Sequence, residues 1–297
     1  MSGDELATTG ALTLGYKEDI DPTLRHRFQA SGAAHVLAVS GLHTGIIYAL
    51  LLCLLTLGGR RKPLYNNRFG RAAVSLVIIV AMWGYAWLTG MTPSVVRAVL
   101  MVTIFEVGRI FYRQAVSLNT IAAAAVLILL VRPLDLWSVS FQLSFSATAA
   151  IVIVARELER MLHRSDWTVQ RLGRLGSWIV GTLIISIAAQ LGTLPLSMLY
   201  FGQISNYFLL TNLIVLPLAF LLVPCGLATV ALGGSTLGLW VGKLTTGFAW
   251  LMNHSVAWLE ALPGSTTRVF IGPAMLAIYY LLWLLFFLIY SRLSPKP

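Results

Sequence analysis

The stretch YFLLTNLIVLPLAFLLVPCGLATVAL at residues 207–232 contains no charged side chain. A helix that crosses the apolar part of a bilayer needs about 20 residues of mostly apolar character. Within the bilayer, backbone polar groups must be paired inside the segment, which favours a helix. The stretch therefore predicts a membrane-spanning helix.

The composition of the whole chain agrees with this prediction. Of the 297 residues, 58% are hydrophobic and 11% are charged, whereas soluble domains carry about 25% charged residues. We find about nine apolar stretches, at residues 36–57, 72–90, 94–112, 115–131, 136–155, 177–199, 207–232, 237–259 and 269–290. The predicted fold is all-α, a polytopic transmembrane helical bundle over residues 31–297. A soluble extracytoplasmic lead-in is expected at residues 1–30.

The basic residues indicate the orientation of the bundle. The net charge is +10, and Lys and Arg gather in the cytoplasmic loops of membrane proteins. The loops after the first, third, fifth and ninth stretches hold Arg60, Arg61, Lys62, Arg68, Arg71, Arg109, Arg113, Arg156, Arg160, Arg164, Arg171, Arg174, Arg292 and Lys296. Alternating spans bring these loops to one side, so we expect the C-terminus in the cytoplasm and the N-terminus outside.

Prolines are expected to interrupt two of the stretches. Pro195 lies inside residues 177–199, and Pro217 and Pro224 lie inside residues 207–232. Proline lacks a backbone N–H and its ring clashes with the carbonyl four residues earlier, which kinks or breaks a helix. We expect Pro195 to kink its helix. The stretch 207–232 is one helix, two half-helices or a re-entrant segment.

Polar residues inside apolar stretches are candidate functional residues, because a charged group there costs about 2.5–3.5 kcal/mol to insert. In HVLAVSGLHTG (residues 35–45), Ser40 and His43 are three positions apart and share a helix face. His35 lies nearby, and Gly41 belongs to a small-residue surface that allows close helix approach. Polar packing, contact with a transported substrate and a Ser–His nucleophile pair are all open. The last lacks a neighbouring carboxylate to orient the histidine.

Two further charged residues lie in the stretch 94–112. Arg97 falls one turn into a helix that starts at Pro93. It either snorkels to the outer interface or faces an aqueous, anion-attracting cavity. Glu106 is the carboxylate that lies clearly inside an apolar stretch. Pairing with Arg109, three residues later, and a coupling-proton role are both open.

Polar side chains recur in two later stretches. In SVSFQLSFS (residues 138–146), polar and apolar residues alternate as in a strand, but a lone strand cannot cross a bilayer. We expect either a buried helix or an unwound segment that lines a cavity, and in both cases Gln142 needs a partner or water. Gln190 lies just before Pro195, where it can satisfy freed backbone groups or line the cavity.

Four blocks of sequence carry a resemblance to a known family. They are SGAAHVLAVSGLHTG (block 1, residues 31–45), MTPSVVRAVLM (block 2, residues 91–101), DLWSVSFQLSFSATAAI (block 3, residues 135–151) and LGTLPLSMLYFGQISNYFLLTNLIVLP (block 4, residues 191–217). In this order they resemble the competence domain of the ComEC family, the inner-membrane DNA-uptake channel of naturally transformable bacteria. The resemblance covers about residues 11–230, with a looser fit to the end.

The resemblance implies a channel in the bacterial inner membrane that passes single-stranded DNA into the cytoplasm. The residues expected along its DNA path are His35, Ser40, Gly41, His43, Arg97, Gln142 and Gln190. Fuller members carry an OB-like domain, and many carry a metallo-β-lactamase-like nuclease domain with a histidine-rich metal motif. The five histidines of this chain form no such motif. We therefore expect no nuclease activity, no metal, no cofactor and no catalytic residue.

The sequence also indicates which partners such a channel would need. It contains no G-x-x-x-x-G-K-[ST] phosphate-binding loop, so an ATP-driven helicase or motor would have to be a separate cytoplasmic protein. A separate extracytoplasmic DNA receptor and the lipid bilayer are the other expected partners, and a homo-oligomer is open. The alternative functions are a proton-coupled secondary transporter of a small solute and an intramembrane hydrolase that uses Ser40 and His43.

Overall fold

The computed structural model of the protein describes residues 3–37, 39–56, 68–111, 118–155, 157 and 173–293. The ranges 57–67, 112–117 and 158–172 lie outside the described residues, and they hold half of the basic side chains on which the predicted orientation depends. Within the described ranges, each predicted apolar stretch contains a helix. The all-α prediction is therefore confirmed for this part of the chain, apart from one pair of short strands.

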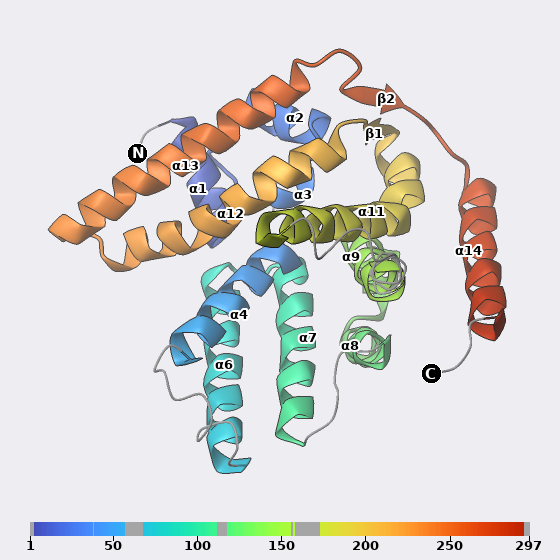
Figure 1. Ribbon diagram of the computed structural model, residues 1–297, viewed down its shortest axis with the longest axis horizontal. Coiled ribbons are helices and arrows are strands. Elements are labelled where there is room, and N and C mark those ends of the chain that lie inside the picture. Colours follow the sequence, from blue (N-terminus) through green and yellow to red (C-terminus); the bar gives the residue numbers. More distant parts are fainter. Residues whose placement is uncertain are drawn as a thin grey trace.

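The helices form an arm, a middle layer and an upper layer in the view of Figure 1. The arm consists of α4 (Gly41–Thr56), α6 (Arg68–Leu88) and α7 (Pro93–Ile110). The middle layer consists of the 3-10 helix η1 (Pro133–Trp137), α9 (Val139–Ala150), its π-helical continuation η2 (Ile151–Ala155) and α11 (Gly173–Phe201). Helix α8 (Leu118–Val131) lies below α9 in this view, beside α7 of the arm. The upper layer consists of α1 (Asp4–Leu14), α2 (Pro22–Ala30), α3 (Ala34–Leu37), α12 (Phe208–Ala231) and α13 (Thr236–Glu260). The C-terminal helix α14 (Pro273–Leu293) stands at one edge.

The three helices of the arm meet at one buried carboxylate. Glu106 of α7 is fully buried and accepts hydrogen bonds from the hydroxyls of Tyr48 of α4 and Ser75 of α6, each at 2.6 Å. Its Oε1 atom also lies 2.7 Å from Nη1 of Arg109. The predicted pairing of Glu106 with Arg109 is therefore confirmed, and the carboxylate has partners on all three helices.

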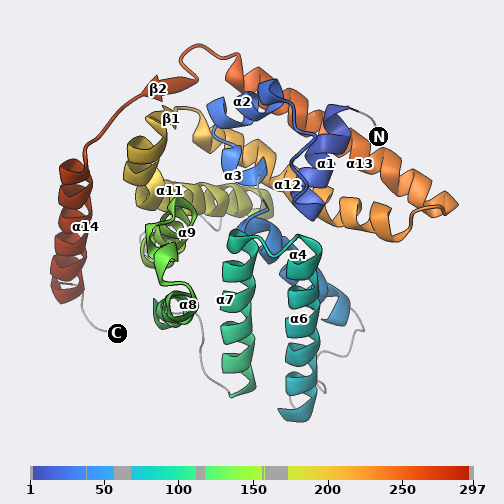
Figure 2. The same cartoon turned by 180° about the vertical axis from the view of Figure 1, so that it is seen from behind.

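The predicted lead-in packs into the same core as the upper layer. Figure 2 shows α1 and α2 lying across α12 and α13. Ala11 and Leu12 of α1 are fully buried, and the Thr8 hydroxyl donates to Oδ1 of Asn253 in α13 at 2.8 Å. Residues 4–30 thus belong to the packed structure of the bundle, because small residues on α1 allow it to lie close to the two long helices.

The two proline-containing helices are each continuous. α12 runs through both Pro217 and Pro224, so the expected alternative of two half-helices at residues 207–232 is wrong. Neighbouring helices pack around α12 and stabilise it. The presence of proline in the sequence does not by itself predict this packing. α11 likewise runs through Pro195. Figure 1 shows that α11 bends near its C-terminal end, so that its last turns point towards β1.

A short antiparallel strand pair joins the ends of α11 and α13. β1 (Gln203–Ser205) pairs with β2 (Thr266–Arg268). The side chain of Asn206 donates to the carbonyl of Gly264 at 2.7 Å and to the hydroxyl of Thr267 at 2.8 Å. The strand pair therefore fixes the turn between α11 and α12 against the segment that leads to α14.

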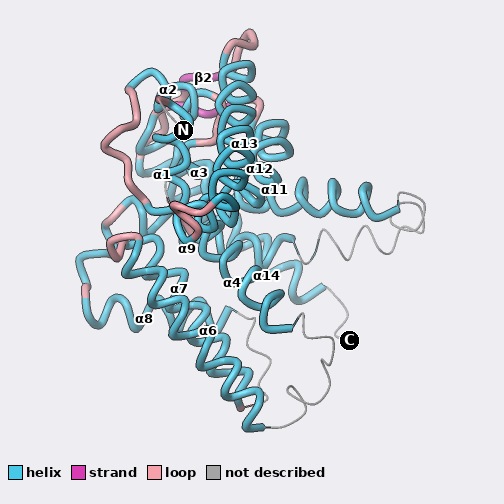
Figure 3. The backbone as a smooth tube through the Cα atoms, turned by 90° about the vertical axis from the view of Figure 1, so that its left-hand side faces the viewer, coloured by secondary structure: helices cyan, strands magenta, loops and turns pink. Residues whose placement is uncertain are grey.

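Three of the described helices are long and apolar enough to cross a membrane, namely Phe69–Leu88, Gly176–Phe201 and Phe208–Ala231. Figure 3 shows the N-terminal part of α11 extending well beyond the packed helices. Large apolar side chains such as Trp87 and Leu130 are 78% and 75% exposed, as expected for lipid contact and not for a soluble surface. These features fit a membrane protein. The prediction of about nine spans is not confirmed, since several other apolar helices are shorter than a bilayer crossing needs.

Candidate functional site

Block 1 forms two helices with a break between them. α3 ends at Leu37 and α4 begins at Gly41, so the helix predicted from residue 36 starts five residues later. The backbone N–H of Leu42 donates to the Ser40 hydroxyl at 3.3 Å, and the backbone N–H of Ser40 donates to Nδ1 of His43 at 3.2 Å. This reciprocal arrangement resembles a helix capping box in which histidine replaces the usual Glu or Gln.

The hydrogen bonds of His43 assign its tautomer. Because Nδ1 accepts a backbone N–H, the proton of the neutral ring lies on Nε2. His43 is fully buried, and its Nε2 atom has no hydrogen-bond partner among the described residues. The Ser40 hydroxyl lies 3.2 Å from the same Nδ1 atom. Ser40 and His43 are thus brought together as predicted, but as the start of a helix, and no carboxylate of the described residues orients the ring.

His35 occupies a different element from the other block 1 residues. It lies on the short helix α3, is exposed, and its Nδ1 lies 3.0 Å from the carbonyl oxygen of Gly32. The prediction of one continuous helix from residue 36 is therefore wrong, because the helix breaks between His35 and His43.

Arg97 joins block 2 to block 3. The residue is 2% exposed, and its Nη2 atom donates to the Ser140 hydroxyl at 2.7 Å, to the Ser140 carbonyl at 3.0 Å and to the Ser94 hydroxyl at 3.0 Å. Ser140 lies in the first turn of α9, which Ser138 caps by accepting the N–H of Phe141 at 3.2 Å. Arg97 therefore neither snorkels to an interface nor faces open water here. It contacts the N-terminal turn of a neighbouring helix.

Gln142 joins block 3 to block 4. Its amide nitrogen donates to the carbonyl of Leu136 at 3.0 Å, and its amide oxygen accepts from the hydroxyl of Tyr200 in α11 at 2.7 Å. The strand-like alternation around Gln142 forms a helix, α9, so the alternative of an unwound segment is wrong. Gln190 is half-buried in α11, and the described residues offer its side chain no hydrogen-bond partner.

Glycines bring the remaining blocks into contact. A Cβ atom on Gly41 would lie 3.8 Å from Cβ of Ala98, so block 1 lies beside block 2. Gly32 has a φ of +89°, and a Cβ atom there would lie 2.8 Å from Cβ of Ser205 in block 4. The Thr211 hydroxyl of block 4 also donates to the carbonyl of Ser31 in block 1 at 2.6 Å.

The contacts between the blocks close into a ring. Block 1 contacts block 2, block 2 contacts block 3, block 3 contacts block 4, and block 4 contacts block 1. We call this arrangement the four-block ring and define it by the pairs Gly41–Ala98, Arg97–Ser140, Gln142–Tyr200 and Ser31–Thr211. Segments that are far apart in the sequence are therefore joined by three hydrogen-bonded contacts and one close approach of small residues.

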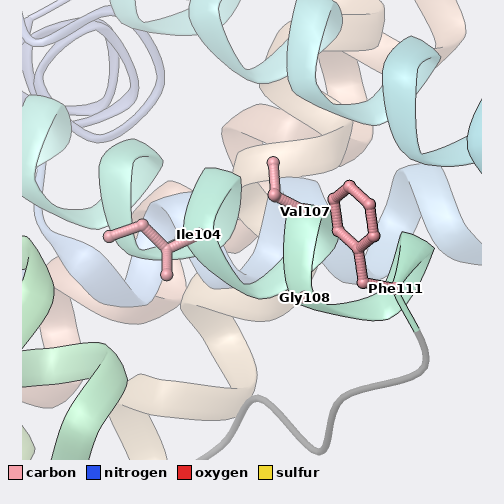
Figure 4. Close-up of a pocket in the computed structure, with 4 residues that line it drawn as sticks. All are labelled: Ile104, Val107, Gly108 and Phe111. Carbon is pink, nitrogen blue, oxygen red and sulfur yellow. The ribbon is translucent and has the colours of Figure 1, made fainter.

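A surface hollow lies outside this ring. Figure 4 shows it beside α7, where it is lined by Ile104, Val107, Gly108 and Phe111. Ile104, Val107 and Gly108 belong to α7, Phe111 follows it directly, and none of the four has a polar side chain. Among the described residues, the hollow therefore has no side chain that would bind a charged or strongly polar ligand.

Three polar contacts of the site were not predicted from the sequence. Ser140 and Tyr200 lie in the quoted blocks, but only the structure shows that they bind Arg97 and Gln142. Asn212 donates to the Ser186 hydroxyl at 3.1 Å, and its side-chain oxygen is buried without a partner among the described residues. An amide inside an uncharged apolar stretch is a signal that could have identified Asn212.

The comparisons with known proteins agree with the resemblance. ComE operon protein 3 of Bacillus subtilis (strain 168) is 28% identical over 276 residues, which cover 92% of this chain and 32% of that protein. Recombination protein 2 of Haemophilus influenzae is 26% identical over 247 residues, which cover 82% of this chain and 31% of that protein. The chain thus spans about a third of the length of these curated relatives. No solved structure matches it.

A family model gives the assignment. The family described as Competence protein matches residues 12–294, which includes all four blocks. The match begins in α1, in agreement with the packing of the predicted lead-in against α12 and α13. The chain belongs to the Competence protein family.

Proposed function

We propose that this chain is the membrane-embedded channel module that passes single-stranded DNA into the cytoplasm during natural transformation. It would lie in the bacterial inner membrane as a multi-pass protein with its N-terminus outside and its C-terminus in the cytoplasm. Membership of the Competence protein family and the apolar helices support this proposal. The observation that carries it is the four-block ring.

The four-block ring contains polar groups whose burial costs free energy in a membrane protein, which is why the ring indicates function. Buried polar and charged groups in apolar helices are costly and usually mark a substrate path. Here Arg97, Gln142 and the Ser40–His43 pair come from separate helices and gather in one structure. A polar path through apolar surroundings is what a strongly charged strand requires.

The accessible polar groups of the site are weak hydrogen-bonding groups. His35 is exposed and Gln190 is half-buried, whereas Arg97 is buried against Ser140. A channel must bind its passenger weakly enough to release it, and closely spaced arginines would hold a phosphate backbone tightly. We propose that His35 and Gln190 contact the strand, and that Arg97 and Gln142 hold the helices in place around it.

The proposal requires other proteins. A separate extracytoplasmic receptor would deliver the DNA, and an ATP-driven helicase or motor would pull the strand on the cytoplasmic side. These partners, and assembly into a homo-oligomer, stay predictions. The lipid bilayer would surround the exposed apolar side chains, such as Val80 at 63% exposure.

The transporter alternative has less support from the contacts. Proton coupling would need a carboxylate that exchanges its partners, but Glu106 is fully buried and accepts from Tyr48, Ser75 and Arg109. A group with this many fixed partners is suited to joining helices.

The proposal is tested by DNA uptake in a competent bacterium whose only inner-membrane channel protein carries this chain in place of its matching third. The cell's own receptor and motor remain. We expect labelled DNA to reach the cytoplasm, and the Gln190→Ala variant to reduce this arrival severalfold. The matched control is Thr246→Ala in α13, whose hydroxyl bonds only within its own helix. Membrane-inserted protein that passes no DNA, or equal uptake by both variants, would count against the proposal.

A further inference from the structure

The C-terminal helix α14 contacts the rest of the protein mainly through one other helix. Figure 1 shows α14 apart from the arm and the two layers, and its main contact among the described residues is with α11. Its large exposed apolar residues include Met275, Ile278, Leu281, Leu282 and Leu285. Tyr279 and Tyr280 are half-buried instead. The two tyrosines therefore mark the side of α14 that meets the protein.

Both tyrosine hydroxyls donate to backbone carbonyls of α11. Tyr279 donates to the carbonyl of Leu191 and Tyr280 to the carbonyl of Gly192, each at 2.8 Å. In a regular helix the carbonyl of Leu191 would accept from the N–H four residues later. That residue is Pro195, which has no N–H and disturbs the preceding turn. The tyrosines thus bind the turn whose helical hydrogen bonding the proline disrupts.

The same turn packs tightly against α9. A Cβ atom on Gly192 would lie 2.5 Å from Cβ of Ala150 and 2.6 Å from the carbonyl oxygen of Ser146. Any larger residue would push the two helices apart. The turn is therefore contacted by both α9 and α14. Tyr200, which bonds Gln142 in the four-block ring, lies in the segment of α11 that follows Pro195.

We infer that Tyr279 and Tyr280 are positioning residues that hold the bend of α11 at Pro195 and so keep Tyr200 against Gln142. The hydroxyl of Tyr279 takes the place of the missing proline N–H at the carbonyl of Leu191. The inference rests on these contacts and does not require that the transported molecule be DNA. It assigns to α14 a role in the geometry of the four-block ring, through its contacts with Leu191 and Gly192 of block 4.

The test measures a distance across the joint in purified, membrane-reconstituted protein. Spin labels at Leu134→Cys and Phe201→Cys report how the last turns of α11 lie relative to the segment before α9, with Cys53 and Cys225 replaced by alanine. Both label sites are exposed, at 81% and 59%. We expect one narrow distance distribution in the parent. The Tyr279→Phe and Tyr280→Phe changes together should broaden it, raising other populations about threefold to tenfold for each hydroxyl lost.

Two controls keep the result specific. Tyr207→Phe removes a hydroxyl that donates to the carbonyl of Pro263 at 2.9 Å, away from the bend, and should leave the distance unchanged. In a Pro195→Ala background, the restored N–H can bind the carbonyl of Leu191, so Tyr279→Phe should have no further effect there.

An unchanged distribution in the double tyrosine variant overturns the inference. So does an equal effect of Tyr207→Phe, or an equal effect of Tyr279→Phe with and without Pro195. The expected distances in a chain that passes no DNA would support this inference and count against the proposed function.

Discussion

Arg97 of α7 and Ser140 of α9 are joined by two hydrogen bonds, one to the serine hydroxyl at 2.7 Å and one to its carbonyl at 3.0 Å. The pair links α7 and α9, which are separated in the sequence by α8 and η1. It also brings the guanidinium to the first turn of α9, although cations are favoured at the opposite end of a helix. The buried charge therefore depends on its hydrogen bonds to the two serines.

The first prediction concerns the stability of this contact. Arg97→Ala should lower the free energy of unfolding by about 1.5–3 kcal/mol, because it removes hydrogen bonds made by a charged group. Ser140→Ala should cost less, since the carbonyl acceptor remains. Thermal unfolding of the purified protein in detergent measures both effects.

The matched control is Arg132→Ala. Arg132 lies 4.0 Å from Asp135 and its side chain is 68% exposed, so its loss should change stability by less than about 1 kcal/mol. Equal melting temperatures for the Arg97 and Arg132 variants would show that the buried contact does not stabilise the bundle.

The second prediction concerns the pair Gln142 and Tyr200. Because they share one hydrogen bond of 2.7 Å, Tyr200→Phe and Gln142→Leu should each reduce DNA uptake. The double variant should be little worse than either single variant, since the same interaction is lost. Uptake assays on the four chains form a double-mutant cycle. Strictly additive losses would indicate that the two side chains act independently.

The third prediction uses two glycines of the same helix. Gly192→Ala should destabilise the protein and reduce uptake, because its Cβ atom would lie 2.5 Å from Ala150. Gly181→Ala should be neutral or slightly stabilising, since nothing lies within 4 Å of its Cβ position and alanine favours a helix. Protease resistance in membranes compares the two variants. Similar resistance would mean that α9 can move away from α11 at little cost.

The fourth prediction separates a structural from a proton-coupling role of Glu106. Glu106→Ala removes the acceptor of the Tyr48 and Ser75 hydroxyls and should destabilise the arm by about 1–3 kcal/mol for each donor left unsatisfied. Glu106→Gln retains a hydrogen-bonding oxygen and should keep more uptake than Glu106→Ala. A Glu106→Gln protein that is fully folded yet inactive would favour the proton-coupled transporter.

The sequence was sufficient to predict the helices but not how they meet. Uncharged stretches such as residues 207–232 predicted helix because no other structure pairs their backbone groups in a membrane. The pairing of Glu106 with Arg109 followed from their spacing of three residues. The continuity of α12 through Pro217 did not, because it depends on neighbouring helices.

In the candidate site, too, the sequence predicted the residues but not their contacts. The polar residues were identified because they are unusual in apolar stretches, but their partners lie far along the chain. Ser140 is 43 residues from Arg97, and Tyr200 is 58 residues from Gln142. Local spacing contains no information on such contacts. The break between α3 and α4 was also missed, since it depends on the cap formed by Ser40 and His43.

The most direct test of the channel proposal is to trap a DNA strand in transit. Cells carrying Gln190→Cys, with Cys53 and Cys225 replaced by alanine, would take up DNA that bears thiol-reactive groups. The account predicts a covalent adduct between the strand and residue 190. It predicts none for Ile278→Cys, which is 58% exposed on the outer side of α14. DNA that reaches the cytoplasm without an adduct at residue 190, or with equal adducts at both positions, would contradict the account.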